Sequence, residues 1–193
     1  MLADFYFSIK AWTLATFAPY GFSGLFILAF IESSFFPIPP DILLIILALA
    51  SPEQAYFLAL IATIGSVLGG ILGYYIGFAG EKLILEKLFV KKKLRKIHNL
   101  FNKYESAAVF IGGFTPLPYK LFTIAAGVFY LDFKKFIIAS ILSRGLRFFL
   151  IAFLISFFHE GIETFILEYV NVLSIIFGVL IIGYFIFKKW RRK

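Results

Sequence analysis

The sequence predicts an all-α membrane protein: a single membrane domain over residues 1–193, built on an inverted repeat of two opposed re-entrant helical hairpins. Three observations predict this fold: an apolar composition, prolines inside apolar segments, and clustered basic residues. Hydrophobic residues make up 61% of the chain, whereas soluble domains are about 45–50% apolar. With a mean hydropathy of +0.94, a chain of this length could not bury its apolar surface in water.

The elements of the first half follow in order. Residues 2–17 mix charges with aromatics and predict an interfacial helix. Residues 20–51 predict the first re-entrant hairpin, because the sixteen residues before Pro37, mostly apolar, reach only about 24 Å, short of a hydrocarbon core of roughly 30 Å. A continuous span is the alternative for this segment. Residues 54–79 are long and apolar enough for a transmembrane helix.

The second half repeats this order. Residues 81–103 predict a basic, amphipathic cytoplasmic helix, and residues 105–131 a second re-entrant hairpin. Residues 133–158 and 169–187 predict two further transmembrane helices, and residues 188–193 form a basic tail.

The net charge of +8 is concentrated in two places. Of the 19 basic residues, eight lie between Lys82 and Lys103 and five lie in the tail KKWRRK. Both clusters flank apolar segments, where basic residues mark the cytoplasmic side and attract anionic lipid headgroups. We therefore expect no nucleic-acid partner. The predicted location is the inner (plasma) membrane of the cell, multi-pass, with the basic loop and the C-terminus cytoplasmic.

This sidedness makes the two hairpins opposed. With residues 81–103 inside, the second hairpin enters from the cytoplasm and the first from outside. The loop HEGIETFILE, which carries three glutamates and no lysine or arginine, then lies outside. The side of the N-terminus stays open.

An offset of 79 residues aligns the two proline stretches, FFPIPPDILLI and FTPLPYKLFTI, and places Asp41 on Lys120. The prolines expected at the hairpin turns are Pro37, Pro39, Pro40, Pro116 and Pro118.

Five charged residues lie within the apolar segments: Glu32, Asp41, Lys120, Arg144 and Arg147. Their positions predict that all five converge near the middle of the membrane, where charges pair or face a wet cavity. Simple ion pairs, Asp41 with Lys120 and Glu32 with an arginine, would pin the hairpins. A substrate or proton pathway is the interpretation we favour, because apolar pairs would pin hairpins at lower cost.

The cations predict an anion site. The half-helices that begin at Asp41 and Lys120 would point their positive ends at the midplane, a geometry suited to phosphate. Lys120, Arg144 and Arg147 are the candidate phosphate-binding residues, and Glu32 and Asp41 the candidates for proton coupling or gating. Asp41 could instead cap its own helix.

Two further features of the sequence concern helix packing and the absence of metal-binding and catalytic residues. Gly65, Gly69, Gly73 and Gly77 form a small-residue stripe that lets helices approach closely, within one protomer or in a homodimer. The chain has no cysteine, and its two histidines lie far apart, so we expect no metal, no cofactor and no enzymatic activity.

Three motifs resemble the DedA family, also described by its VTT domain, over roughly residues 20–158. They are ESSFFPIPPD, GGILGYYIG, and GGFTPLPYK followed by AAG, and they are closest to the short bacterial branch with GFTPxPYK. The resemblance implies two opposed re-entrant hairpins and movement of lipids across the bilayer, including flipping of undecaprenyl phosphate and scrambling of phospholipids. It also implies that Glu32 and Asp41 are essential.

The chain departs from the family pattern G-R-F-x-P-x-x-R. Gly113 and Tyr119 stand at the two arginine positions, and Lys120 follows one residue later. Arg144 and Arg147 are candidates to supply the missing positive charge.

The leading hypothesis is a lipid translocase that moves an anionic headgroup, with anionic membrane lipids and possible protons as partners. A proton-coupled transporter of a small soluble solute and a non-transport membrane-organising scaffold are the alternatives. The sequence leaves open which lipid is moved, the direction and energy coupling, and whether the protein is a monomer or a homodimer.

Overall fold

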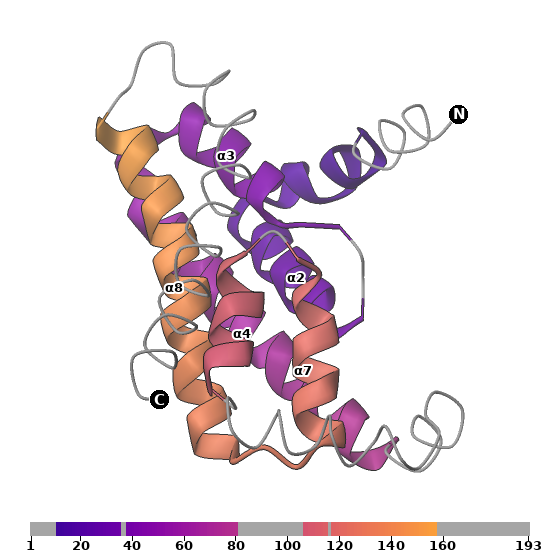
Figure 1. The fold of residues 1–193 in the computed structure, drawn as a ribbon. Helices are drawn as coiled ribbons and strands as arrows, with labels where there is room; N and C mark the ends of the chain where they lie inside the picture. The colour runs from indigo at the N-terminus through magenta and orange to yellow at the C-terminus, as the bar shows by residue number, and fades with distance from the viewer. Residues whose placement is uncertain (1–10, 36–37, 81–105, 116, 158–193) are drawn as a thin grey trace.

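The computed structural model describes residues 11–35, 38–80, 106–115 and 117–157 (Figure 1). These residues form helices and turns and contain no strand, which confirms the predicted helical class for the described part of the chain. The predicted surface helix at 81–103, the last span at 169–187 and the basic tail at 188–193 lie outside the described residues.

The described residues form both short and long helices. Residues 11–17 and 106–114 are helical. The remaining elements are η1 (Ala18–Tyr20), α2 (Gly21–Ser34), α3 (Asp41–Ala50), η2 (Pro52–Gln54), α4 (Ala55–Ala79), α7 (Tyr119–Val128) and α8 (Phe133–Phe157).

Three helical stretches are long and apolar enough to cross a membrane: Ala11–Ser34, Pro52–Ala79 and Phe133–Phe157. The first is bent. Gly21 has a φ of 51°, a conformation that favours glycine, and Gly24 lies directly against the carbonyl oxygen of Phe17. The chain therefore turns between residues 11–17 and α2 (Figure 1). The 14 residues of α2 alone span about 21 Å, less than the hydrocarbon core.

Two pairs of short helices pack beside the long helix α4. Residues 35–40 join α2 to α3, and residues 115–118 join the helical stretch 106–114 to α7. In Figure 1, α3 extends toward one end of the bundle and α7 toward the opposite end. A hydrogen bond from Thr123 Oγ1 to the carbonyl oxygen of Ser33, 3.1 Å long, ties α7 to the end of α2.

The glycine stripe of α4 packs against both short helix pairs. Gly65 and Gly69 lie against backbone carbonyls of α2, and Gly73 and Gly77 lie against residues of α7. A Cβ at any of these four positions would meet an atom closer than real contacts allow. Of the two arrangements left open by the sequence, the stripe therefore takes the one within a single chain.

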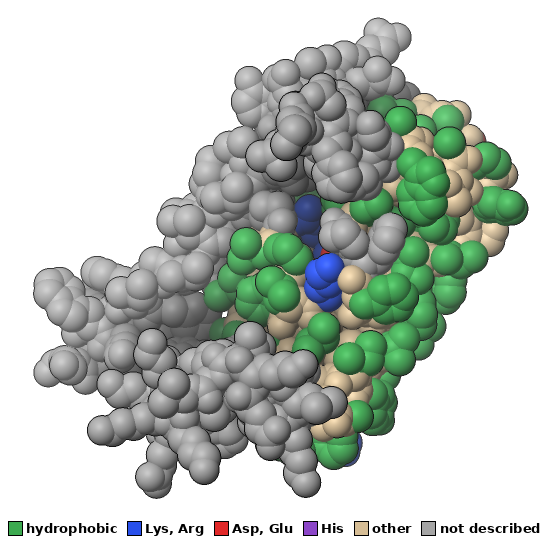
Figure 2. All heavy atoms as spheres, turned by 90° about the vertical axis from the view of Figure 1, so that its right-hand side faces the viewer, with side chains coloured by type: hydrophobic (Ala, Val, Ile, Leu, Met, Phe, Trp, Pro, Cys, Tyr) green, Lys and Arg blue, Asp and Glu red, His purple; other side chains and the backbone are tan. Residues whose placement is uncertain are grey.

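Large apolar side chains cover the outer surface. On α4 they recur every three or four residues, as in Phe57, Leu60, Ile64, Leu68 and Leu72. On the described part of the face in Figure 2, most side chains are hydrophobic, and basic side chains come to the surface near the centre of the view. So much exposed apolar area indicates contact with another apolar phase.

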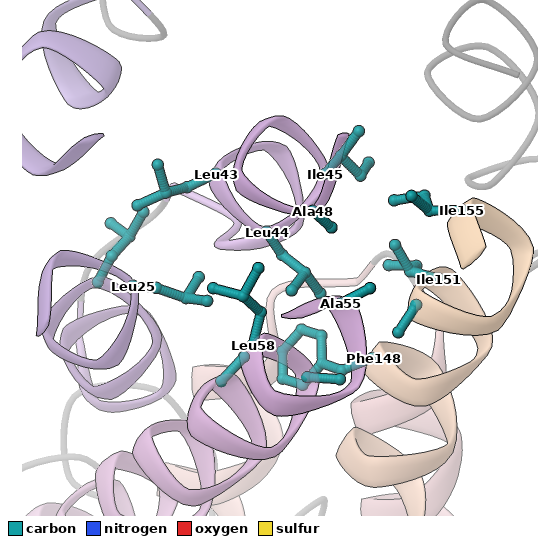
Figure 3. Close-up of a cluster of buried hydrophobic side chains, with 14 residues drawn as sticks. Leu25, Leu43, Leu44, Ile45, Ala48, Ala55, Leu58, Phe148, Ile151 and Ile155 are labelled. Carbon is teal, nitrogen blue, oxygen red and sulfur yellow. The ribbon is translucent and has the colours of Figure 1, made fainter. Parts of the chain in front are cut away.

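Two apolar clusters form the interior. The aliphatic core cluster joins α2, α3, α4 and α8 and comprises Leu25, Leu28, Leu43, Leu44, Ile45, Ala48, Ala55, Leu58, Ala59, Ala62, Phe148, Ile151, Ala152 and Ile155 (Figure 3). The aromatic core cluster comprises Tyr74, Val109, Tyr119, Ala126, Val128, Phe129, Leu131, Phe136 and Ala139.

Candidate functional site

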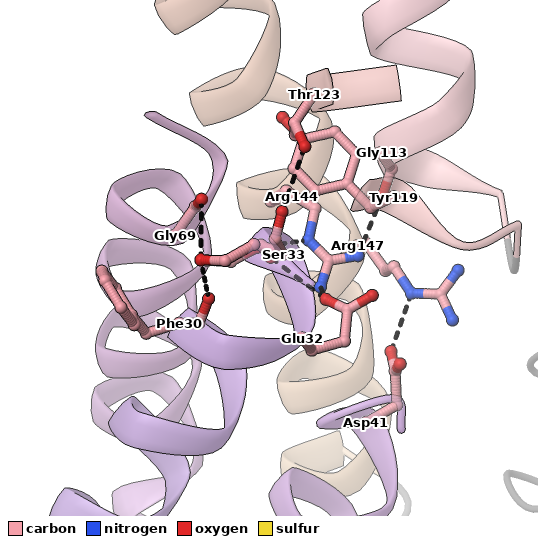
Figure 4. Close-up of polar contacts among 12 residues, drawn as sticks. Phe30, Glu32, Ser33, Asp41, Gly69, Gly113, Tyr119, Thr123, Arg144 and Arg147 are labelled. Atoms are coloured by element: carbon pink, nitrogen blue, oxygen red, sulfur yellow. Dashed lines mark hydrogen bonds and ion pairs between the residues drawn. The ribbon is translucent and has the colours of Figure 1, made fainter. Parts of the chain in front are cut away.

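Two carboxylates and two guanidinium groups meet inside the bundle, and we call them the four-charge cluster (Figure 4). Glu32 lies near the end of α2, and Asp41 is the first residue of α3. Arg144 and Arg147 stand three residues apart on α8 and therefore share one face of that helix. All four side chains are buried.

Arg144 makes the first ion pair and has the larger set of contacts. Its Nη2 atom lies 3.1 Å from Glu32 Oε2, and its Nε donates to Ser66 Oγ at 2.6 Å. Its guanidinium carbon lies 5.1 Å from the ring centroid of Tyr119 and 4.6 Å from that of Phe148. Because Tyr119 and Phe148 belong to the two different core clusters, Arg144 occupies the boundary between them, where cation–π contacts hold its planar group.

Arg147 makes the second ion pair. Its Nε donates to Asp41 Oδ1 at 2.7 Å, and its Nη1 donates to the carbonyl oxygen of Phe114 at 2.9 Å. The ion pair between Asp41 and Lys120, one of the alternatives that the sequence left open, is therefore not formed. Lys120 Nζ instead donates to the carbonyl oxygen of Phe35, at 3.0 Å, and the lysine is only partly buried.

Two of the cations also bind backbone carbonyl groups at the ends of helices. Phe35 follows the end of α2, and Phe114 ends the helical stretch 106–114, so their carbonyl groups have no partner within a helix. Lys120 and Arg147 donate to these two carbonyls. Positive charge at a helix C-terminus is favourable because it opposes the negative end of the helix dipole.

Small polar side chains that the sequence analysis did not single out complete the site. Ser33 Oγ donates to Glu32 Oε2 at 3.0 Å and lies 2.7 Å from Ser66 Oγ. Tyr119 donates its hydroxyl proton to Ser140 Oγ. Two signals were available in the sequence: Ser33 directly follows a buried acid, and Ser66 stands inside the glycine stripe.

The turn prolines have a simpler role. Pro40 and Pro118 immediately precede α3 and α7, where the missing N–H of proline leaves no helical hydrogen bond unmade. Pro39 precedes Pro40 in the first turn, whereas Pro37 and Pro116 fall outside the described residues.

The chemistry of the described site is ionic. Among the residues that the structure describes, no group of three or more His, Cys, Asp or Glu could hold a metal ion. The cluster contains two planar guanidinium groups, and each forms an ion pair with a carboxylate. Another oxyanion could take the place of that carboxylate. An arginine that binds a carboxylate with this geometry can also bind a phosphate.

Comparison with known proteins identifies the family of the chain. A family model of the VTT domain matches residues 36–157, more than half of the chain. The chain belongs to the VTT-domain (DedA) family. The predicted family is thereby confirmed, and the matched range contains Asp41, Arg144 and Arg147.

Relatives of this VTT-domain chain include proteins with and without a stated function. An uncharacterized protein of Haemophilus influenzae is 35% identical over 181 residues, covering 92% of the chain and 93% of the relative. Undecaprenyl phosphate transporter A of Staphylococcus aureus is 30% identical over 139 residues, covering 64% and 66% of the two chains. The protein of the same name from Bacillus subtilis is 26% identical over 145 residues, covering 67% and 73%.

No solved structure matches the VTT-domain chain at a significant level. Its three apolar helical stretches and its relatives identify it as a multi-pass membrane protein. The relatives with a stated function are named as transporters, not as enzymes.

Proposed function

We propose that this chain is a membrane lipid translocase, a flippase or scramblase, that moves an anionic lipid headgroup through the four-charge cluster. The observation that carries the proposal is the pair of buried arginines held by carboxylates where the two short helix pairs meet. Polyprenyl phosphate and anionic phospholipids are the lipid classes whose phosphate groups suit binding by two guanidinium groups.

The cost of the cluster supports a role beyond stability. Replacement of a buried ion pair by well-packed apolar residues is often neutral or stabilising, by about 1–4 kcal/mol. The aliphatic core cluster, which begins at Phe148 directly beside Arg147, shows that the same helix can pack with apolar residues. If the cluster served only to hold the helices together, apolar residues at these positions would do so without the free-energy cost of burying four charges.

Exchange of partners gives a mechanism. A lipid phosphate that binds Arg144 or Arg147 displaces the carboxylate of Glu32 or Asp41. The displaced carboxylate then lies in an apolar interior without a partner, an arrangement that costs several kcal/mol. Uptake of one proton by that carboxylate balances one negative charge of the incoming phosphate, so the cluster and a singly charged headgroup together stay neutral, and proton movement thereby accompanies headgroup movement.

The membrane placement is part of the same proposal. The pairs formed by α2 with α3 and by the stretch 106–114 with α7 are re-entrant hairpins of an inverted repeat, which enter from opposite faces. The four-charge cluster then lies near the midplane, and the apolar chains of the lipid stay in the bilayer. Lys120, which is partly exposed, makes the first contact with the headgroup. The basic loop and the C-terminus are cytoplasmic, in the inner membrane.

The named relatives support the choice of substrate class. Two of them are undecaprenyl phosphate transporters, whose cargo joins a phosphate to an apolar chain. Their identities of 26% and 30% leave room for a different anionic lipid in this chain.

A translocation assay tests the proposal. Proteoliposomes carry a fluorescent polyprenyl phosphate or a fluorescent anionic phospholipid, and the probe that becomes accessible to a membrane-impermeant quencher is measured over time. The variant Asp41→Asn with Arg147→Gln keeps a neutral, hydrogen-bonded pair and is expected to lose translocation. The matched control Lys134→Gln removes a positive charge from the exposed start of α8 and is expected to keep it. Equal rates in both variants would overturn the assigned site.

A further inference from the structure

The two arginines of the four-charge cluster are bound unequally, although they stand three residues apart on α8. A guanidinium group carries Nε–H and Nη2–H along one edge, and such an edge can bind a carboxylate or a phosphate through two parallel hydrogen bonds. The partners of this edge therefore decide whether an arginine can take up another oxyanion. In Figure 4 the guanidinium of Arg144 lies among its neighbours, whereas that of Arg147 points away from Arg144.

Both positions of this edge are occupied in Arg144. Its Nη2 donates to Glu32 Oε2 at 3.1 Å, and its Nε donates to Ser66 Oγ at 2.6 Å. The rings of Tyr119 and Phe148 also lie against the guanidinium group, with centroids 5.1 and 4.6 Å from its carbon. A phosphate that bound Arg144 through this edge would have to displace both a carboxylate and a hydroxyl.

Two serine hydroxyls close the contacts of Arg144 into a ring. Ser66 Oγ, which accepts from Arg144, lies 2.7 Å from Ser33 Oγ, and Ser33 Oγ donates to Glu32 Oε2 at 3.0 Å. A guanidinium only donates and an ionised carboxylate only accepts, so the hydroxyl protons run from Ser66 to Ser33 and from Ser33 to the carboxylate. Because Ser33 lies on α2 and Ser66 on α4, the ring joins α2, α4 and α8.

Arg147 uses one position of the same edge within the part of the chain that the structure describes. Its Nε donates to Asp41 Oδ1 at 2.7 Å, its Nη1 donates to the carbonyl oxygen of Phe114, and no described residue accepts from its Nη2. Both partners also adjoin the turns, since Asp41 follows residues 35–40 and Phe114 precedes residues 115–118. Positions at the ends of elements are those at which a chain rearranges most readily.

Fewer contacts are lost when the oxyanion exchanges at Arg147. Its bond to Phe114 does not involve the Nε–Nη2 edge and stays in place. The contact of Arg147 with Asp41 is shorter than that of Arg144 with Glu32, 2.7 against 3.1 Å. A phosphate that binds through two parallel hydrogen bonds replaces the bond to Asp41 and adds a second one. Exchange at Arg144 would instead open the whole serine ring and leave buried hydroxyls without partners.

We propose that the lipid phosphate displaces Asp41 and binds Arg147, whereas Arg144 keeps its ion pair throughout. The hydroxyl groups of Ser33 and Ser66 hold that pair closed and are positioning residues, because they act on the headgroup only through Arg144. This inference rests on the proposed function, which leaves open which of the two arginines takes the headgroup. The cluster then has one exchange site per chain, for a phosphate carried on an apolar chain.

Lipid binding to variants of the two carboxylates tests the assignment on the full chain. The dissociation constant of a polyprenyl phosphate is measured in detergent by native mass spectrometry, which separates folded from unfolded protein by charge state. A carboxylate that the phosphate must displace competes with it, so its neutralisation tightens binding. Asp41→Asn is expected to lower the dissociation constant about tenfold more than Glu32→Gln does, the order expected for one hydrogen bond to a charged group.

A polyprenol without phosphate is the control ligand and is expected to bind both carboxylate variants alike. Equal dissociation constants of the polyprenyl phosphate in the two variants, or tighter binding to Glu32→Gln, would overturn the inference. So would the same order of affinities with the polyprenol, because the phosphate would then not be the group that exchanges.

Variants of the arginines give an independent measurement, which holds even if Asp41→Asn does not fold. Arg147→Lys and Arg144→Lys keep the positive charges and remove the planar edge that binds an oxyanion through two bonds. The dissociation constant of the polyprenyl phosphate is expected to rise about tenfold more in Arg147→Lys than in Arg144→Lys. An equal rise, or a larger one in Arg144→Lys, would contradict the assignment.

The positioning role of the serines is tested by removing one hydroxyl. Ser66→Ala frees the Nε of Arg144, and in this background Glu32→Gln is expected to tighten lipid binding as much as Asp41→Asn does in the unchanged chain. Thr63→Val is the matched control, since it removes another buried hydroxyl of α4 whose hydrogen bond stays within that helix. The difference between the carboxylate variants is expected to persist in Thr63→Val. If it also persists in Ser66→Ala, the serine does not hold the arginine closed.

The inference and the proposed function fail separately. Lipid translocation by the unchanged protein, together with equal effects of the two carboxylate variants on binding, would keep the translocase and remove the assignment to Arg147. The predicted order of affinities in a protein that moves no lipid across the bilayer would keep the binding site at Arg147 and remove the translocase.

Discussion

The aliphatic core cluster and the four-charge cluster are neighbours on α8 and are built on opposite principles. Phe148, Ile151 and Ile155 share one buried apolar cluster with residues of α3 and α4. Arg144 and Arg147 depend on named atoms of Glu32 and Asp41 at 3.1 and 2.7 Å. The apolar contact tolerates change in proportion to the volume lost, whereas the ionic contact fails as soon as one partner is missing.

The largest predicted effect separates one charge from its partner. Arg147→Leu leaves Asp41 buried without its cation and is expected to lower the free energy of unfolding by about 3–5 kcal/mol. Denaturant unfolding in detergent micelles measures this loss. The double variant Asp41→Asn with Arg147→Gln removes both charges and is expected to lose much less, so its loss should be far below the sum of the two single variants.

If the loss of unfolding free energy in the double variant equals the sum of the losses in the two single variants, the two residues do not act as a pair. The contrast between the two clusters then disappears.

The next largest loss of stability is expected from a substitution in the aliphatic core cluster. Leu44 is fully buried, and Leu44→Ala is expected to cost about 2–5 kcal/mol through lost packing and the remaining cavity. Protein that still folds should translocate lipid at the normal rate, because no charge has changed. A translocation rate that falls further than the amount of folded protein would show that the aliphatic cluster takes part in transport.

Close packing between helices gives an intermediate effect. A Cβ at Gly69 would run into the carbonyl oxygen of Phe30, and Gly69→Ala is expected to cost about 1–3 kcal/mol as α2 and α4 separate. Gly145→Ala is the matched control, since its nearest neighbour, Thr63 Cγ2, lies at an ordinary 3.7 Å. Thermal unfolding of the two variants in detergent should differ clearly. Equal melting temperatures would mean that the stripe is not a tight contact.

The smallest effect concerns a neutral hydrogen bond. Tyr74 donates its hydroxyl proton to the carbonyl oxygen of Leu131 at 2.7 Å, joining α4 to the turn before α8. Tyr74→Phe is expected to cost about 0.5–1.5 kcal/mol, well below the loss of one ionic partner. Tyr75→Phe, on the exposed side of the same helix, is the control and should change the unfolding midpoint little.

The sequence predicted the helical class and the family, because apolar composition and short motifs are local properties. It also directed attention to Glu32, Asp41, Arg144 and Arg147, since charges in apolar segments stand out from their surroundings. It could not predict their pairing. The offset of 79 residues suggested Lys120 for Asp41, but partner choice depends on how α8 rotates against α3, and that rotation is set by packing between distant segments.

The polar neighbours were missed for a related reason. Ser66 and Ser33 meet across 33 residues of sequence, and a serine in an apolar helix is by itself unremarkable, since such hydroxyls often bond the carbonyl four residues back. Only the close approach of α2 to the glycine stripe brings the two hydroxyls together.

The four-charge cluster also has an electrical consequence. With both carboxylates ionised, its two negative and two positive charges sum to zero. A membrane potential of 100 mV acts on each unbalanced elementary charge that crosses the bilayer with about 2.3 kcal/mol, and it exerts no net force on a neutral group. With both ion pairs closed, the protein's own centre therefore adds nothing, and any voltage dependence of transport would report the charge of the lipid and of the protons that the carboxylates take up as it binds.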